Sequence, residues 1–192
     1  MMHKELITNH IQEHLQLISK LDDSFVSKIS DISSILSQRL ESGSRLFFCG
    51  NGGSASDSQH LAAELIGRFS VNRKPLRALA LNTDTSVLTC ISNDFSYDDI
   101  FSRQLEALAC HGDVLIALST SGDSKNVNNA ISQANSMGVT TIALLGKSGG
   151  KSVDLANYSL VVPSKSTARI QECHILLGHI LCDLIEQELG LV

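Results

Sequence analysis

Aromatic residues and concentrated positive charge are both scarce in this chain. Its 192 residues include no tryptophan, two tyrosines and six phenylalanines, and the formal net charge is −5. Nucleic-acid surfaces need basic patches, and those that bind single strands also need aromatic rings on which bases stack. Because no run of like charges occurs either, we do not expect nucleic-acid binding as the main function.

Proline and long apolar runs are also nearly absent. With two prolines, no internal repeat and no low-complexity tract, nothing marks a linker. We therefore predict a single domain over residues 1–192, with a helical pair at 1–42 and an α/β core with a C-terminal helix at 43–192. No stretch approaches the roughly 18 apolar residues of a membrane span, and residues 1–20 carry charges throughout. These features predict a cytoplasmic protein.

The cysteines form no framework. They are odd in number and irregularly spaced, and no CxxC pair occurs, which argues against disulfides, a thiolate zinc site or a dithiol redox centre. Most stand among apolar neighbours, so we predict small core residues. The five are Cys49, Cys90, Cys110, Cys173 and Cys182.

Hydrophobic periodicity divides the chain into helices and strands. Apolar residues three and four positions apart predict two amphipathic helices, one on each side of Asp22. Their stripes suit packing on a sheet or against another subunit, and we favour the second use. Short apolar runs then alternate with helical stretches, which predicts a parallel sheet wrapped in helices. The predicted strands are 45–49, 76–81, 113–118, 140–145 and 158–162, and the last helix is 167–189.

Two loops after predicted strands have the composition of anion-binding sites. Residues 50–54 (GNGGS) contain three glycines, and residues 119–124 (STSGDS) contain four hydroxyls and a glycine. In parallel sheets, ligands bind where strands give way to helix N-termini, because backbone N–H groups are free there. Each loop alone is equally well explained as an ordinary turn with serine caps. Together at one edge of a sheet, they favour a phosphate site.

Two other nucleotide motifs are incomplete. The run beginning at Gly50 starts like a dinucleotide fingerprint, but Ala55 replaces its last glycine and no acidic residue closes the next strand. The run ending at Ser148 resembles the tail of a P-loop, but Thr141 stands where a glycine is required. We expect neither cofactor site.

Titratable side chains gather on two predicted helices. His60 and Glu64 are four residues apart on one helix and so share a face, and His179 lies among apolar residues of the last helix. Such pairs are frequently surface ion pairs, and a helical histidine is often just a partly buried residue. The apolar neighbours of Glu64 and His179 predict burial, which is costly for a carboxylate without a partner or a function. A buried glutamate and histidine can move a proton between adjacent carbons.

At this point the sequence resembles a known family, the sugar isomerase (SIS) domain proteins, and within it the phosphoheptose isomerases. The resemblance covers nearly the whole chain. The matching motifs are 49–54 (CGNGGS), 60–68 (HLAAELIGR), 93–95 (NDF), 119–124 (STSGDS), 149–150 (GG) and 169–179 (RIQECHILLGH).

The resemblance implies a three-layer α/β/α domain with a five-stranded parallel sheet, assembled as a homotetramer whose active sites are lined by more than one subunit. It implies conversion of sedoheptulose 7-phosphate to D-glycero-D-manno-heptose 7-phosphate through an enediol. That reaction is the first step towards ADP-heptose and the heptose of lipopolysaccharide. Glu64 and His179 match the acid/base residues of the family.

The same resemblance assigns binding roles. It places the phosphate on Ser54, Ser119, Thr120, Ser121 and Ser124. It places the sugar beside Asn51, Gly52, Gly53, Glu64, Asn93, Asp94 and Gln171. Many members also bind zinc, one per subunit, through residues matching His60, Glu64, Gln171 and His179, a nitrogen and oxygen set that suits this metal.

Two alternatives remain open. A non-catalytic relative with the same fold and tetramer binds the replication initiator protein, and residues 182–185 resemble it, although it lacks counterparts of Glu64 and His179. The chain could also act on a different sugar phosphate. One departure from some members is Ala168, which stands where they have aspartate. Related members with Thr-Ala at this place also resemble isomerases, so we interpret Ala168 as the mark of a subgroup.

Overall fold

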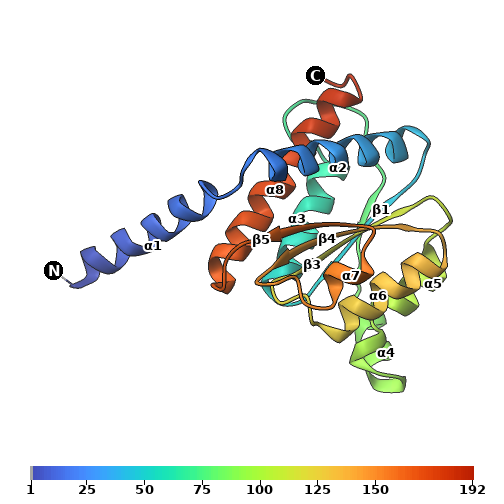
Figure 1. The fold of residues 1–192 in the computed structure, drawn as a ribbon. Coiled ribbons are helices and arrows are strands. Elements are labelled where there is room, and N and C mark those ends of the chain that lie inside the picture. The colour runs from blue at the N-terminus through green and yellow to red at the C-terminus, as the bar shows by residue number, and fades with distance from the viewer. Residues whose placement is uncertain (1) are drawn as a thin grey trace.

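The computed structural model describes residues 2–192, so Met1 of the predicted domain and helical pair lies outside the described residues. The chain forms eight α-helices, one short 3-10 helix and five strands within that range (Figure 1). The elements run in the order α1 Met2–Ile18, α2 Asp23–Glu41, β1 Leu46–Gly50, α3 Gly53–Ile66, β2 Ala78–Ala80, α4 Thr85–Asp94, η1 Tyr97–Asp99, α5 Ser102–Leu108, β3 Val114–Ser119, α6 Lys125–Ser136, β4 Thr140–Gly146, α7 Ser152–Leu155, β5 Tyr158–Val162 and α8 Thr167–Glu188.

All five strands pair in parallel, in the order β2-β1-β3-β4-β5. The predicted five-stranded parallel sheet is thus confirmed, and each predicted strand overlaps an observed one. The largest difference is β2, which is limited to three residues where six were expected. The first two helices also lie where the periodicity places them, and the carboxylate of Asp22 caps α2 by accepting the N–H of Phe25.

Two apolar layers cover the two faces of the sheet. Alternate residues of β1 show the division, because Phe48 packs with the core under α2, α3 and α8, whereas Phe47 packs with the core under α4, α5 and α6. The result is an α/β/α sandwich in which α3 and α8 lie on the same face. This shared face brings the titratable residues of the two helices together.

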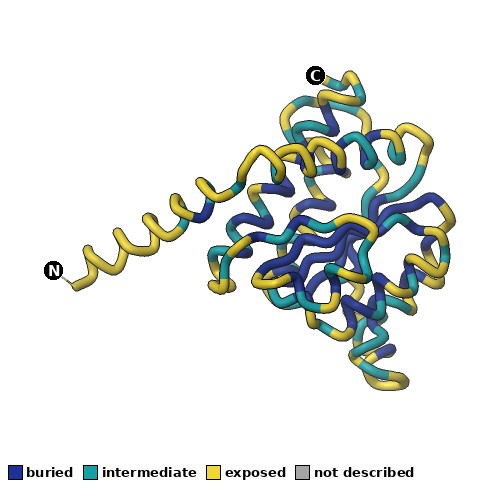
Figure 2. The backbone as a smooth tube through the Cα atoms, in the orientation of Figure 1, coloured by how far each residue is buried: buried dark blue, intermediate teal, exposed yellow. Residues whose placement is uncertain are grey.

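The N-terminal helix differs from the others, because it projects from the body of the molecule (Figures 1 and 2). Of residues 2–18, Leu17 alone is buried. Apolar side chains along the rest of α1 are exposed, including Leu6, Ile7, Ile11 and Leu15. The predicted role of this helix in oligomerisation stays a prediction.

Three of the five cysteines are core residues as predicted, and two are not. Cys49, Cys173 and Cys182 are buried, whereas Cys90 and Cys110 are exposed. Cys90 faces outward on α4, and Cys110 lies in the turn before β3, so apolar neighbours in sequence did not ensure burial. No helix among residues 2–192 combines the length and the apolar character needed to cross a membrane.

Candidate functional site

The loop at residues 50–54 is shaped by its glycines. Gly52 has a backbone φ of +57°, in the left-handed region that glycine adopts without a steric penalty. A Cβ atom on Gly53 would lie 2.2 Å from Nε2 of Gln171, so only glycine leaves room for that side chain. Ser54 follows, buried in the first turn of α3. Three of the predicted sugar and phosphate residues, Gly53, Ser54 and Gln171, therefore lie at one place.

The loop at residues 119–124 is stabilised by hydrogen bonds to its own side chains. Oγ of Ser119 accepts a hydrogen bond from the N–H of Gly122 at 3.0 Å, and Oγ of Ser121 accepts from the N–H of Asp123 at 3.1 Å. Oγ of Ser119 also lies 3.4 Å from Oγ of Ser124. Four of the five residues predicted to hold the phosphate, Ser119, Thr120, Ser121 and Ser124, thus lie together between the end of β3 and the start of α6.

A second backbone segment, residues 149–152, packs against this loop at Gly122. Gly122 has φ +70°, and a Cβ on it would lie 1.9 Å from the carbonyl oxygen of Gly149. The N–H of Ser152 donates to the carbonyl of Gly122 at 2.9 Å. Glycine is required at this contact because two backbones meet there with no space for a side chain.

Asn51 links the two loops. Its amide and that of Asn126 form a reciprocal pair, with Nδ2-to-Oδ1 distances of 2.8 and 2.9 Å, and the hydroxyl of Tyr97 donates to Oδ1 of Asn51 at 3.0 Å. Asn126 is buried in the first turn of α6. Asn51 therefore ties the loop at residues 50–54 to the start of α6, directly after the loop at residues 119–124. The two loops follow neighbouring parallel strands, β1 and β3, and so lie at the same edge of the sheet.

The remaining predicted sugar residues lie elsewhere. Asn93 and Asp94 end α4 and are exposed, with Nδ2 of Asn93 donating to Oδ1 of Asp94 at 2.7 Å. Helix α4 covers the face of the sheet opposite to α3 and α8. Within one chain, the sheet separates these two residues from His60, Glu64 and His179.

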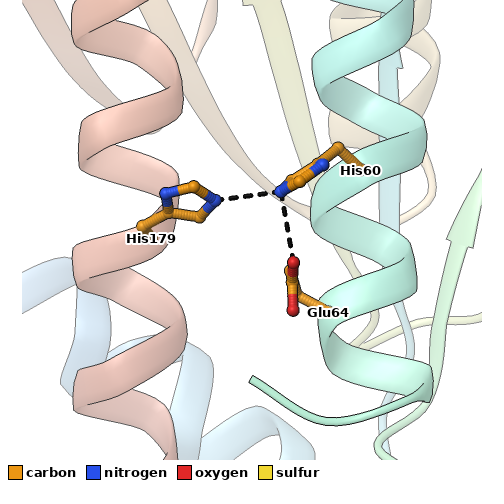
Figure 3. Close-up of side chains that lie close together, drawn as sticks. All are labelled: His60, Glu64 and His179. Carbon is orange, nitrogen blue, oxygen red and sulfur yellow. Dashed lines mark hydrogen bonds and ion pairs between the residues drawn. The ribbon is translucent and has the colours of Figure 1, made fainter. Parts of the chain in front are cut away.

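The titratable residues of α3 and α8 converge, although His179 is 119 positions from His60 in sequence (Figure 3). Nε2 of His60 lies 2.9 Å from Nε2 of His179 and 3.2 Å from Oε1 of Glu64. The two imidazole centroids are 5.1 Å apart. A glutamate and two histidines therefore share one small volume, as moving a proton or holding a cation requires.

The packing of α3 on α8 produces this convergence. A Cβ at Gly178 would lie 2.4 Å from Cδ2 of Leu61, a buried residue one position from His60. The two helices run in the same direction, because Gln171 meets Gly53 near their starts and His179 meets His60 further along. Gly178 thus permits the close approach on which the histidine contact depends.

The site is more open than its apolar neighbours predicted. The side chain of Glu64 is 24% exposed and that of His60 49% exposed, and His179 is half-buried. Ile66, Leu176 and Ile180 on the same two helices are exposed. The predicted burial of Glu64 and His179 is therefore wrong within one chain, because only some of their apolar neighbours, such as Leu61 and Leu177, face the core while the others face solvent.

His60, Glu64 and His179 fit a divalent transition metal. One ligand atom from each lies within 4.8 Å of the other two, and the set combines imidazole nitrogens with a carboxylate oxygen. That chemistry suits zinc, which takes nitrogen and oxygen ligands at about 2 Å. Gln171, the fourth predicted ligand, precedes His179 by eight residues, or ~12 Å of helix rise, and lies against Gly53.

Sequence reasoning missed two residues near this group. Phe69 packs its ring on His179 with centroids 5.5 Å apart. Asp57, one turn before His60, has a half-buried carboxylate whose Oδ2 lacks a hydrogen-bond partner among residues 2–192, and burial raises its pKa. Asp57 lies three residues before His60 on the same helix, and this spacing could have indicated from sequence that the two residues are neighbours. Phe69, in an irregular segment after α3, gave no such signal.

Comparison with known proteins agrees with this architecture. A family model described as SIS domain matches residues 9–146. A phosphoheptose isomerase of Aquifex aeolicus is 50% identical over 163 residues, which are 85% of each chain. A phosphoheptose isomerase of Clostridium acetobutylicum is 46% identical over 188 residues, covering 97% of this chain and 96% of the relative.

Solved structures give the same result. A phosphoheptose isomerase from Neisseria gonorrhoeae superimposes with a TM-score of 0.91 at 41% identity, covering 96% of this chain and 98% of that one. Another, from Francisella tularensis, gives 0.93 at 34% identity and covers 97% and 100%. From sequence, fold and these relatives together, the chain belongs to the SIS domain family and, within it, to the phosphoheptose isomerase family.

Proposed function

We propose that this protein is an aldose–ketose isomerase that converts sedoheptulose 7-phosphate to D-glycero-D-manno-heptose 7-phosphate. The observation that carries the proposal is the convergence of Glu64 and His179 beside His60, on a fold whose relatives are phosphoheptose isomerases. We further propose that the product leads to ADP-heptose and the heptose of lipopolysaccharide, and that the enzyme acts on this charged metabolite in the cytoplasm.

The proposed chemistry moves one proton between adjacent carbons. Glu64 takes a proton from C1 of the ketose while protonated His179 gives one to the C2 carbonyl oxygen, which yields an enediol. His179 carries the hydroxyl proton, taking it from O1 as the C1 carbonyl forms, and Glu64 returns its proton to C2. Atoms and electrons balance, and no oxidant is needed.

Zinc at His60, Glu64 and His179, with Gln171 as the predicted fourth ligand, would supply Lewis-acid polarisation of substrate oxygens. The ligand atoms of the first three residues support this site. A ligand bound to a metal is less free to carry a proton, so the protein's own contribution there is to fix the imidazole and carboxylate positions.

The phosphate loops lie far from the acid/base pair along α3. Ten residues separate Ser54 from Glu64, which corresponds to ~15 Å of helix rise. The reacting carbons are at the opposite end of the seven-carbon chain from the phosphate, so a separation is expected. We propose that Ser54, Ser119, Thr120, Ser121 and Ser124 hold the phosphate.

We also propose that the enzyme is a homotetramer in which subunits share active sites. Exposed apolar residues on α1, α3 and α8 support this assembly, since large apolar patches on a protein mark interaction surfaces. Neighbouring subunits would then bring Asn93, Asp94 and Gln171 to an acid/base pair from which the sheet or the helix separates them within one chain. We propose that residues 1–192 form one domain within this assembly, because Ile32 and Leu36 of α2 lie in the core under α3 and α8.

A direct assay tests the function. The purified protein is incubated with sedoheptulose 7-phosphate, with added Zn²⁺ or with a chelator, and aldose formation is followed. Glu64→Gln is expected to lower kcat by at least about 10³-fold with the fold and assembly retained, because the carboxamide cannot take a proton. Glu106→Gln, an exposed change on α5, is the matched control and should retain full activity.

Retained turnover by Glu64→Gln would refute its assignment as the base. Absence of turnover by the unmodified protein under every metal condition, together with tight binding to the replication initiator protein, would instead identify the chain as a non-catalytic binding module.

A further inference from the structure

A buried ion pair lies behind the candidate site and has no part in the proposed chemistry. Nε of Arg73 is 2.8 Å from Oε1 of Glu186, and the side chains are 2% and 0% exposed. Arg73 belongs to the irregular segment between α3 and β2, and Glu186 to the last turns of α8, 113 positions later. The pair therefore connects the two helices that carry His60, Glu64 and His179.

Glu186 organises the segment that follows α3. Its carboxylate accepts hydrogen bonds from the backbone N–H groups of Phe69 at 3.1 Å, Ser70 at 3.0 Å and Val71 at 3.4 Å. Burial raises the pKa of Glu186, but the Ser70, Phe69, Arg73 and Val71 donors outweigh burial and hold the pKa below its usual value. The carboxylate is thus charged and fully used, and residues 69–71 are fixed to α8.

Arg73 holds the end of α3. Its Nη2 donates to the carbonyl oxygen of Glu64 at 2.9 Å and its Nη1 to that of Leu65 at 2.7 Å. Carbonyls in the last turn of a helix lack helical partners, and a cation there is favoured by the helix dipole. One guanidinium group therefore ties the backbone of Glu64 to the carboxylate on α8.

Phe69 links Glu186 to His179. Its N–H is bound by Glu186, and its ring packs on His179 with centroids 5.5 Å apart and planes tilted by 34°. His179 also meets His60. The imidazole therefore contacts both a ring placed by Glu186 and a ring from α3.

We propose that Arg73, Glu186 and Phe69 act as positioning residues that set the distance of Glu64 and His60 from His179. Their effect on turnover rests on the proposed function, but their effect on the geometry of the three-residue group does not. They touch neither substrate nor reacting atoms in this scheme. A purely structural pair would affect folding stability alone, whereas positioning residues also change how well His60, Glu64 and His179 bind a cation together.

The test measures cation affinity rather than stability. Zn²⁺ affinity is determined by competition with a chromophoric chelator, and Co²⁺ binding by its visible spectrum, for folded proteins well below their unfolding temperatures. Glu186→Gln removes the charge and presents an amide to backbone donors. We expect about a tenfold or greater loss of affinity, in the range found when groups that orient metal ligands are removed.

Asp113→Asn is the matched control. Asp113 is also buried, and its carboxylate also accepts backbone N–H groups, from Arg45 at 2.7 Å and Cys110 at 2.9 Å, but it binds no residue of the candidate site. This variant should lose stability as Glu186→Gln does and keep its Zn²⁺ affinity. Equal affinity losses in the two variants would overturn the proposal.

Substitutions of Phe69 provide a second, less disruptive test that leaves the Arg73–Glu186 ion pair unchanged. Phe69→Leu should weaken Zn²⁺ binding and alter the Co²⁺ spectrum, whereas Phe69→Tyr keeps the ring and should restore both. If Glu186→Gln does not fold, this pair of variants decides the question, and unchanged affinity in Phe69→Leu refutes the role of the ring.

Turnover separates this inference from the proposed function. With sedoheptulose 7-phosphate, Phe69→Leu should lower kcat more than it changes KM, since the phosphate loops are untouched. If the unmodified protein turns over no substrate, the proposed function fails, yet the Zn²⁺ affinities still decide whether these residues position the group.

Discussion

His174 is a histidine that the fold keeps neutral. It is fully buried on α8, and its Nε2 lies 3.1 Å from the carbonyl oxygen of Leu145, which can only accept a hydrogen bond. The proton therefore sits on Nε2, and Nδ1 has no partner among residues 2–192. Burial lowers the pKa of His174 to about 4 from 6.5, with the bond to Leu145 opposing the shift. Protonation of this ring in the folded state would place a charge in dry protein.

This pKa predicts a loss of stability in acid. Between pH 6.5 and about 4, the unfolded chain binds a proton at residue 174 that the folded chain does not, so the free energy of unfolding falls as pH decreases. The contribution is about 1.4 kcal/mol per pH unit, and about 3 kcal/mol once pH is below both values. Denaturant unfolding from pH 7 to 5 measures it.

His174→Gln is the variant that isolates the effect, because glutamine can donate to Leu145 but does not titrate in this range. Its unfolding free energy should depend less steeply on pH than that of the unmodified protein between pH 6.5 and 5. Parallel curves for the two proteins would show that His174 does not carry the dependence.

At the scale of elements, the site depends on how closely α3 approaches α8. Leu61 fills the space over Gly178, and His60 and His179 flank this contact. The side chain of Leu61 cannot move away easily, since it is buried and packed in the core. The spacing of the helices therefore sets the spacing of the titratable groups.

Gly178→Ala should separate the two helices. The added methyl group would lie 2.4 Å from Leu61, and overpacking of this kind costs about 1–3 kcal/mol of folding free energy. Weaker Zn²⁺ binding should accompany the loss, because His179 moves away from His60. Thermal unfolding and Zn²⁺ titration measure the two effects.

A second substitution supplies the control. Leu61→Ala in the Gly178→Ala background reopens the space, so the double variant should recover Zn²⁺ affinity relative to Gly178→Ala alone. Strictly additive effects of the two changes would contradict a direct contact as the cause.

At the scale of the whole molecule, α1 is the helix whose apolar side chains are mostly not packed against the rest of the chain. Ile7, Ile11 and Leu15 form a stripe at helical spacing, and each is more than half exposed. Figure 2 shows this helix exposed over most of its length, beyond the body of the domain. A helix with little packing against its own domain gains stability by burying such a stripe against another copy.

Ile11→Asp should therefore reduce the size of the assembly. A carboxylate in an apolar helix interface is strongly unfavourable without a partner, so the proposed tetramer should dissociate to smaller species. Light scattering coupled to size exclusion measures the mass. Asn9→Asp adds the same charge elsewhere on α1 and should leave the mass unchanged. A monomeric unmodified protein, or an intact Ile11→Asp tetramer, would refute this role of α1.

The order of helices and strands, the two loops and the pairing of His60 with Glu64 were readable from the sequence, because each depends on residues close together in the chain. Apolar periodicity fixes which face of an element is buried, and glycine or hydroxyl side chains after a strand mark a ligand-binding turn. Family motifs named the candidate residues, but neither the motifs nor the local spacing set the distances between them.

Only the tertiary structure decided which distant residues meet. His179 reaches His60 across 119 positions, and Arg73 reaches Glu186 across 113, because two helices pack in parallel on one face of the sheet. It also decided exposure, leaving Glu64 partly open where its apolar neighbours predicted burial. Local patterns report the preference of a segment for an interior, whereas contacts and burial depend on the other segments that the fold brings against it.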